Sequence, residues 1–252
     1  MNNGYVKSTS ENTGEAKIIF HHPASNSLPS RLLIQLETHI LDAGKDPAIK
    51  VIVLESEGRT FCAGASFDEL LSLKDYTQAV DFFMGFARVI NAIRKVPKFV
   101  LVKVQGKAVG GGVGIIAAAD YAIAHEAAAI KLSELSIGIG PFVIAPAVKR
   151  KIGIAAFSQL SINATKWHNA YWAKNKGLYA EVWDTREQME KESRLLIEKL
   201  LEYDAVAMEK IKEELWEGTE NWDDLLAQKA RISASLILQE FAQEKISEFK
   251  RK

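Results

Sequence analysis

The sequence predicts an α/β protein in which a core of alternating strands and helices is followed by a helical C-terminal region. Through the first two-thirds of the chain, short runs rich in Ile and Val alternate with amphipathic helical patterns. From about residue 184 onward the pattern is helical and heavily charged, with no proline. The 252 residues are 48% apolar and 25% charged, which is typical of a globular domain. We therefore expect a core over residues 1–183 and a helical region over residues 184–252.

Three strands and two helices are predicted before the first glycine cluster. The strands are short runs bounded by turn residues, namely Ala16–Phe20, Lys50–Glu55 and Lys98–Gln105. Leu32–Leu41 carries its apolar residues on one helical face, with Ser30 as its expected N-cap. A second amphipathic helix over Tyr76–Arg94 ends before Pro97, because proline disfavours a helical backbone in the residue before it.

A glycine cluster opens the next part of the chain. The segment 110–114 (GGGVG) follows the third strand and precedes an apolar helix that includes Ile115–Ala119. Two short apolar runs, Tyr121–Ala124 and Ala129–Leu132, then lead to the loop Ile137–Pro141.

Charge and hydropathy exclude several classes of protein. Lys and Arg together number 32, as do Asp and Glu, so the basic surface of a nucleic-acid-binding domain is not expected. The longest apolar stretch, Ala108–Ala119, is 12 residues long, whereas a membrane helix needs roughly 20. The N-terminal residues lack the apolar segment of a secretory signal, and the single Cys62 fits a reducing compartment. We expect a cytoplasmic protein with no nucleic-acid or membrane partner.

None of the common nucleotide, hydrolase or metal motifs fits this sequence. A dinucleotide fingerprint counted from Gly110 fails because residue 115 is Ile. A nucleophile elbow counted from Gly64 fails because residue 68 is Asp. The five histidines lack metal-ligand spacing, so no metal site is expected.

Two small-residue turns between a strand and a helix are the strongest functional signals. The consecutive glycines Gly110–Gly112 allow a ligand to approach the backbone closely, and they place free amides at a helix N-terminus, where negative charge is favoured. The second turn, Arg59–Phe67, leads into an acidic helix start and offers another free amide. Two such turns can converge on one carbonyl oxygen. They predict an oxyanion or phosphate site, and close packing of a helix on the sheet is the alternative.

Four segments together resemble motifs of the enoyl-CoA hydratase/isomerase (crotonase) family. FCAGASFDEL is similar to the family's F-C/A-A-G-A-D segment, and VQGKAVGGGVGIIAAAD is similar to its glycine block ending in an aspartate. HPASNSLPSRLLIQL resembles its N-terminal segment, and SINATKWHNAYWAKNKGLYAEV resembles its later helix and strand. The resemblance runs in register from about residue 16 to residue 183.

The resemblance implies a fold, a substrate class and an assembly. The fold would be a crotonase-like right-handed spiral of ββα units with a helical C-terminal oligomerisation region. The protein would form a homotrimer, or a hexamer made of two trimers. Its substrate would be an acyl-CoA thioester, as in fatty acid metabolism, and no separate cofactor would be required because coenzyme A is part of the substrate.

The same resemblance assigns the residues of the site. The amides of Ala65 and Gly111 would bind the thioester oxygen as it becomes an enolate, and each would stabilise the transition state by roughly 3 kcal/mol. The remaining substrate contacts would come from the surrounding loops, from Asn26, Ser27, Leu28, Ala63, Ser66, Phe67, Asp68, Gly110, Pro141 and Phe142. Ser66 stands where the family usually has Asp, and Phe142 stands where hydratases commonly have Gly.

The carboxylates depart from the hydratase pattern. Hydratases of the family carry two glutamates; the position of the first is Gly114 here, and the second falls on Glu134. A single acid/base group favours double-bond isomerisation of an enoyl-CoA, with Glu134 moving the proton. The alternatives are hydration of a 2-enoyl-CoA, including a branched one of the methylglutaconyl-CoA type, dehalogenase- or decarboxylase-like chemistry, and a weakly catalytic CoA-binding scaffold subunit.

Other polar residues near these motifs have structural interpretations. We expect Asp120 to pack or cap the end of the glycine helix and Glu126 to be a solvated turn residue. Asp68 and Glu69 are expected to begin a helix, where negative charge is favoured. Cys62 is interpreted as a small buried residue rather than a nucleophile, because no histidine is adjacent in sequence.

Overall fold

Two β-sheets lie at the centre of the protein in a computed structural model that describes residues 4–10 and 14–250. The larger sheet has the strand order β1 (Tyr5–Ser10), β2 (Glu15–His21), β3 (Val51–Ser56), β5 (Phe99–Val104), β7 (Tyr121–His125) and β10 (Glu181–Trp183). The smaller sheet has the order β4 (Thr60–Cys62), β6 (Lys107–Val109), β8 (Ala129–Lys131) and β9 (His168–Asn169). Residues 1–3 of the N-terminal segment and residues 251–252 of the predicted helical region lie outside the described residues.

Successive pairs of strands build these two sheets as turns of a spiral. In each of the pairs β3 and β4, β5 and β6, and β7 and β8, the first strand joins the larger sheet and the second joins the smaller one. The strands from β2 to β10 pair in parallel in the larger sheet, and β4, β6 and β8 pair in parallel in the smaller sheet. The carboxyl ends of β4 and β6 therefore lie side by side, the kind of position where open α/β sheets bind ligands.

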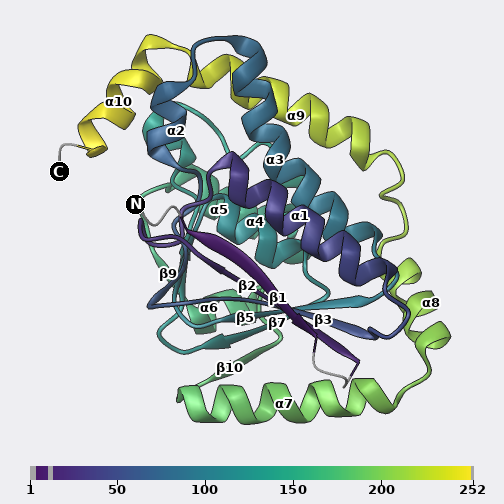
Figure 1. Cartoon of the computed structure of the whole chain (residues 1–252). Coiled ribbons are helices and arrows are strands. Elements are labelled where there is room, and N and C mark those ends of the chain that lie inside the picture. Colours follow the sequence, from purple (N-terminus) through teal and green to yellow (C-terminus); the bar gives the residue numbers. More distant parts are fainter. Residues whose placement is uncertain (1–3, 11–13, 251–252) are drawn as a thin grey trace.

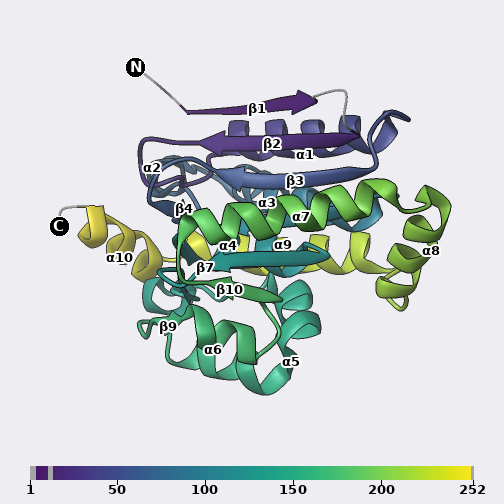
Figure 2. The ribbon, with the colours of Figure 1, turned by 90° about the horizontal axis from the view of Figure 1, so that it is seen from below.

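Helices cover both faces of the larger sheet. One face carries α1 (Ser30–Lys45), α3 (Tyr76–Lys95), α4 (Gly111–Ala118) and α9 (Trp222–Ile237), as Figure 1 shows. The other face carries α7 (Arg186–Glu202), which overlies the sheet and runs roughly along its strands in Figure 2. Leu32, Leu36 and Ile40 of α1 are completely buried, so its apolar face forms part of the core. No helix of the described ranges combines the length and apolarity needed to cross a membrane.

The strands and helices expected before the glycine cluster are present, and three strands, β1, β4 and β6, were missed. β1 is an edge strand that pairs only with β2, and its last four residues are exposed. A strand whose polar side chains face solvent lacks the alternating apolar pattern on which the prediction relied.

The prediction of Ser30 as the N-cap of α1 is wrong. Pro29 holds the N-cap position, and Ser30 is the first helical residue. The amide of Ser30 donates to the carboxylate of Glu69 at 2.8 Å, and its hydroxyl donates to the same carboxylate. A carboxylate from α2 (Phe67–Ser72) therefore satisfies the first turn of α1 and fixes the two helices against each other.

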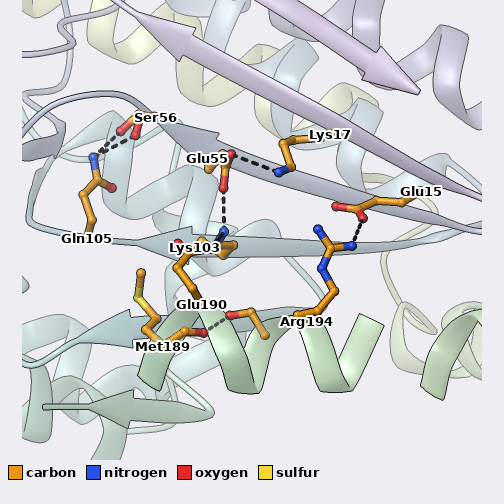
Figure 3. Close-up of polar contacts among 10 residues, drawn as sticks. Glu15, Lys17, Glu55, Ser56, Lys103, Gln105, Met189, Glu190 and Arg194 are labelled. Atoms are coloured by element: carbon orange, nitrogen blue, oxygen red, sulfur yellow. Dashed lines mark hydrogen bonds and ion pairs between the residues drawn. The ribbon is translucent and has the colours of Figure 1, made fainter. Parts of the chain in front are cut away.

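Ion pairs hold α7 against the sheet (Figure 3). The buried Lys103 on β5 places its Nζ atom 2.8 Å from Glu55 on β3 and 2.5 Å from Glu190 on α7. Burial acts to lower the pKa of Lys103, but the two carboxylates raise it above its ordinary value. Arg194 on α7 pairs with Glu15 on β2 at 2.8 Å. These contacts join α7 to β5 and β2, and the pair of Lys103 with Glu55 joins β5 to β3.

Candidate active site

The two glycine-rich turns meet at the ends of β4 and β6. Gly64 has a φ angle of +89° and Gly110 one of +51°, in the left-handed region that glycine adopts without strain. A Cβ atom added to Gly64 would lie 3.0 Å from the carbonyl oxygen of Val109 and 3.8 Å from the nitrogen of Gly111. The turns therefore converge so closely that a side chain at Gly64 would press against the neighbouring backbone.

Two backbone amides at this meeting point are free to bind a ligand. The N–H of Leu28 donates to the carbonyl of Gly64 at 2.8 Å, and its carbonyl accepts from the N–H of Ser66 at 3.4 Å, so Ala65 is held between two bonded residues. Gly111 is the first residue of α4, where the N–H groups have no partner within the helix. Within the described residues, neither Ala65 nor Gly111 donates a backbone hydrogen bond. Both sites can therefore stabilise a negatively charged oxygen.

Glu134 lies beside these amides with an unusual protonation equilibrium. It begins a short 3-10 helix, η1 (Glu134–Ile137), and its Oε1 atom is 2.7 Å from the position that a Cβ on Gly110 would take. The residue is only partly exposed, and its Oε2 atom is buried without a hydrogen-bond partner in the described part of the chain. Burial raises the pKa of Glu134 from 4.5 to about 7. The carboxyl group can therefore both accept and release a proton near neutral pH.

These groups line one cavity, which continues into a surface groove. The cavity encloses about 60 Å³ and is mainly apolar, with Ala63, Ala65, Phe67, Gly110, Gly111, Glu134, Pro141 and Phe142 among its predicted site residues. The groove encloses about 350 Å³ and is lined by Ser27, Ala63, Ala65, Ser66, Phe67 and Asp68, together with Ala24 and Ser25. Because the cavity and the groove share Ala63, Ala65 and Phe67, a long ligand can occupy both.

Glu134 is the one ionisable residue among the described residues that line the cavity. Gly114, which stands where hydratases of the family have their first glutamate, lies on α4. The space beside it is filled by a neighbouring side chain. A Cβ on Gly114 would lie 2.3 Å from Cγ2 of Ile144, which is 3% exposed. The side chain of Ile144 therefore fills the space into which a side chain at residue 114 would project.

Two of the predicted substrate-binding residues are buried away from the groove. Asn26 is 2% exposed and donates through Nδ2 to the carbonyls of Glu57 and Thr60, at 2.7 and 2.8 Å. Its Oδ1 accepts from the N–H of His22 at 2.7 Å. Leu28 is completely buried and pairs with the Ala65 turn through its backbone. In this structure the side chains of Asn26 and Leu28 shape the loop, while Ser27 lines the groove itself.

The sequence patterns did not point to the wall that the C-terminal helices add. Ser233 of α9 lines the cavity, together with Phe83 and Phe86 of α3. α9 packs along α3, and α10 (Glu240–Lys250) packs against α2 and η1. The buried face of α9, with Ala230 and Ala234 beside Ser233, is a signal for close helix packing but not for a site.

The polar residues interpreted as structural behave as expected. The side chain of Asp120 is buried and accepts hydrogen bonds from Val100, Lys212 and Trp216. Ser66 caps α2, and Asp68 and Glu69 lie in the first turn of that helix. Cys62 is completely buried, and burial raises the pKa of its thiol to about 12, so it is not a nucleophile at neutral pH.

Comparisons with known proteins identify a family and relatives of this chain. The family model for enoyl-CoA hydratase/isomerase matches residues 10–252. Among curated proteins, the chain is similar to "(7aS)-7a-methyl-1,5-dioxo-2,3,5,6,7,7a-hexahydro-1H-indene-carboxyl-CoA hydrolase" of Rhodococcus jostii (strain RHA1), with 34% identity over 133 residues. That match covers 53% of this chain and 52% of the relative. The chain spans about half the length of the curated relatives it matches first.

Solved structures agree over nearly the whole chain. An enoyl-CoA hydratase from Bacillus halodurans superposes with a TM-score of 0.89 at 21% identity, covering 97% of this chain and 99% of that one. An enoyl-CoA hydratase from Mycobacterium avium subsp. paratuberculosis K-10 superposes with a TM-score of 0.85 at 26% identity, covering 98% and 95%. The predicted crotonase-like fold, an α/β spiral with a helical C-terminal region, is confirmed.

Proposed function

Since the chain belongs to the enoyl-CoA hydratase/isomerase family, we propose that it isomerises a short-chain enoyl-CoA, moving the double bond from carbon 3 to carbon 2. The observation that carries this proposal is the cavity with one ionisable residue, Glu134, beside two free amides among the described residues. Isomerisation needs one group that removes a proton and returns it. Addition of water needs a further group that positions and activates the water.

In the proposed reaction, the two amides bind the thioester oxygen and Glu134 transfers the proton. The thioester oxygen accepts hydrogen bonds from the N–H groups of Ala65 and Gly111, while the ionised Glu134 removes a proton from carbon 2. The electron pair left by that bond delocalises onto the thioester oxygen, and each amide stabilises the resulting dienolate by roughly 3 kcal/mol. Glu134 then returns the proton to carbon 4, so that the double bond lies between carbons 2 and 3 and the enzyme is regenerated.

The size of the cavity favours a short acyl chain. Its volume is about 60 Å³, whereas an apolar cavity known to bind benzene has a volume of about 150 Å³. The bicyclic acyl group in the name of the Rhodococcus jostii relative is larger than benzene. We therefore propose an acyl group of a few carbons, with coenzyme A in the groove that begins at Ala63 and Phe67.

The proposed activity is tested by supplying two isomeric substrates separately. We expect 3-pentenoyl-CoA to become 2-pentenoyl-CoA without a change in mass. Chromatography with mass detection monitors this conversion. Rapid addition of water to 2-pentenoyl-CoA would instead identify a hydratase and overturn the argument from Gly114. If neither thioester reacts but both bind, the proposed isomerase activity is overturned and the alternative of a CoA-binding scaffold subunit is favoured.

Restoring a second carboxylate is expected to require two substitutions. Gly114→Glu alone places its Cβ against Ile144 and should destabilise the protein by about 1–3 kcal/mol, as overpacked cores do. Adding Ile144→Ala opens that space, so we expect the double variant to recover stability and to add water to 2-pentenoyl-CoA faster than the wild type. Thermal unfolding and the hydration assay measure the two effects. Equal stability of Gly114→Glu and wild type would contradict the packing argument.

We also propose that the protein assembles as a homotrimer or a hexamer of two trimers. Ile154 and Ile162 of α5 (Ala145–Ile162) are 75% and 74% exposed, and Leu135 beside Glu134 is 54% exposed. Apolar side chains of this kind are available for contacts between subunits. Sedimentation velocity distinguishes these assemblies from a monomer.

A further inference from the structure

A buried serine on the C-terminal wall of the cavity has no structural partner. Ser233 is 1% exposed and lines the cavity that contains Glu134. Within the residues that the structure describes, its hydroxyl forms no hydrogen bond, and its Oγ atom is not among the fully enclosed polar atoms that lack a partner, so the hydroxyl has access to the cavity. A hydroxyl that faces the cavity without a partner in the protein is a candidate for contact with a ligand.

Several other serines within helices of this chain return their hydroxyl groups to the helix backbone, whereas Ser161 of α5 is buried without a partner in the described part of the chain and does not line the cavity. Ser193 of α7 donates to the carbonyl of Met189 at 2.5 Å, and Ser235, two residues after Ser233 on α9, donates to the carbonyl of Ile232 at 2.9 Å. Such bonds to a preceding carbonyl are the usual way in which a serine satisfies itself within a helix. The hydroxyl of Ser233 forms no such bond to its helix and is available to a ligand.

Because the side chains around Ser233 are apolar, a hydrogen bond to its hydroxyl would distinguish one acyl chain from another. The cavity wall nearest to α9 consists of apolar side chains that include Phe83 and Phe86 of α3. Phe86 also packs against the oxyanion turn, because a Cβ on Gly111 would lie 2.1 Å from its ring. An acyl chain whose thioester oxygen binds Gly111 can therefore extend along this apolar wall, where water competes weakly for hydrogen bonds.

We propose that the Ser233 hydroxyl hydrogen-bonds an oxygen carried by the acyl chain, so that the substrate is a short, oxygenated acyl-CoA thioester. This inference rests on the proposed function, because it requires an acyl group in the cavity. It makes Ser233 a specificity-determining residue that contacts the part of the substrate away from the reacting carbons. Glu134 and the two amides would perform the same chemistry on a purely hydrocarbon chain.

A matched pair of unreactive thioesters tests this assignment. 4-Hydroxybutanoyl-CoA and pentanoyl-CoA differ by a hydroxyl in place of a methyl group, and neither has a double bond to move. We expect the wild type to bind 4-hydroxybutanoyl-CoA more tightly, and we expect Ser233→Ala to reduce the ratio of the two dissociation constants about ten-fold. Isothermal titration calorimetry measures both constants. Ser235→Ala is the matched control and should leave the ratio unchanged, because its hydroxyl is bonded to its own helix.

The outcomes separate this inference from the proposed function. If both thioesters bind and Ser233→Ala leaves their ratio unchanged, Ser233 does not select the acyl chain and the inference is overturned. If neither thioester binds to the wild type, the acyl-CoA function fails as well. Ser233→Ala should fold normally, since it removes no hydrogen bond within the protein, and a thermal unfolding curve verifies this before the titration.

Discussion

Replacement of Glu134 by glutamine is expected to lower kcat by about 10²- to 10⁴-fold and, at the same time, to stabilise the fold above pH 7. The loss of activity follows because the amide cannot remove a proton, and a positioned acid/base group contributes about this factor. The gain in stability follows from the position of the carboxylate. Its Oε2 atom is buried with no hydrogen-bond partner in the described part of the chain. A group that contributes only to structure would not show both effects together.

The direction of the stability change depends on pH. Burial raises the pKa of Glu134 to about 7 in the folded protein, above its ordinary value of 4.5. Between these values the folded state binds more protons than the unfolded state, so stability falls as the pH rises from 4.5 through 7. Glutamine does not ionise and avoids this loss. We expect Glu134→Gln to be more stable than the wild type by about 1–3 kcal/mol at pH 8, and by much less at pH 5.

Chemical denaturation at pH 5 and pH 8 measures the stability difference, and the rate profile gives an independent observation. If the ionised carboxylate is the base, kcat/KM of the wild type should rise with pH and level off above about pH 7. Glu126→Gln is the control, since Glu126 is exposed in a turn and should change neither rate nor stability. An unchanged kcat in Glu134→Gln would remove this residue from the mechanism.

The elements that could be predicted are those whose sequence pattern reflects which of their faces are buried. The strands β2, β3 and β5 are rich in apolar residues because both faces of the larger sheet are covered by helices. β1 has no such pattern because it is an edge strand with its polar residues in solvent. The N-cap of α1 was placed wrongly because its capping carboxylate, Glu69, comes from a helix 39 residues further along the chain.

The same distinction applies to the candidate site, where motifs indicate some features and only the fold shows the others. Glycines mark both turns in the sequence, yet only the fold brings Gly64 and Gly111 together. The burial that shifts the pKa of Glu134 is equally invisible in its local sequence, where serines lie on both sides within two residues. Ser233 belongs to the last third of the chain and reaches the cavity because α9 packs along α3. Residue types at a site can thus be predicted from motifs, whereas burial and long-range neighbours require the structure.

Asp120→Ala is expected to produce the largest loss of stability, about 3–5 kcal/mol, without a direct effect on the active site. Asp120 Oδ2 accepts from Val100 N at 2.7 Å and lies 2.9 Å from Nζ of Lys212, while Oδ1 accepts from Nε1 of Trp216 at 2.9 Å. Lys212 is 3% exposed, so alanine would leave its ammonium group buried without a counter-charge. The same substitution would remove the acceptors of a backbone amide and an indole.

The pH dependence and a surface control make this prediction specific. Burial lowers the pKa of Lys212 in the folded protein. Without Asp120 that pKa should fall further, so the folded state binds fewer protons than the unfolded state, and the deficit of Asp120→Ala should shrink as the pH rises from 7 towards 10. Glu213→Ala removes only the exposed pair with Lys210 and should cost less than about 1 kcal/mol. Because Asp120 does not line the cavity, kcat per folded molecule should be unchanged at low temperature. A large fall in kcat without loss of stability would instead assign Asp120 to the reaction.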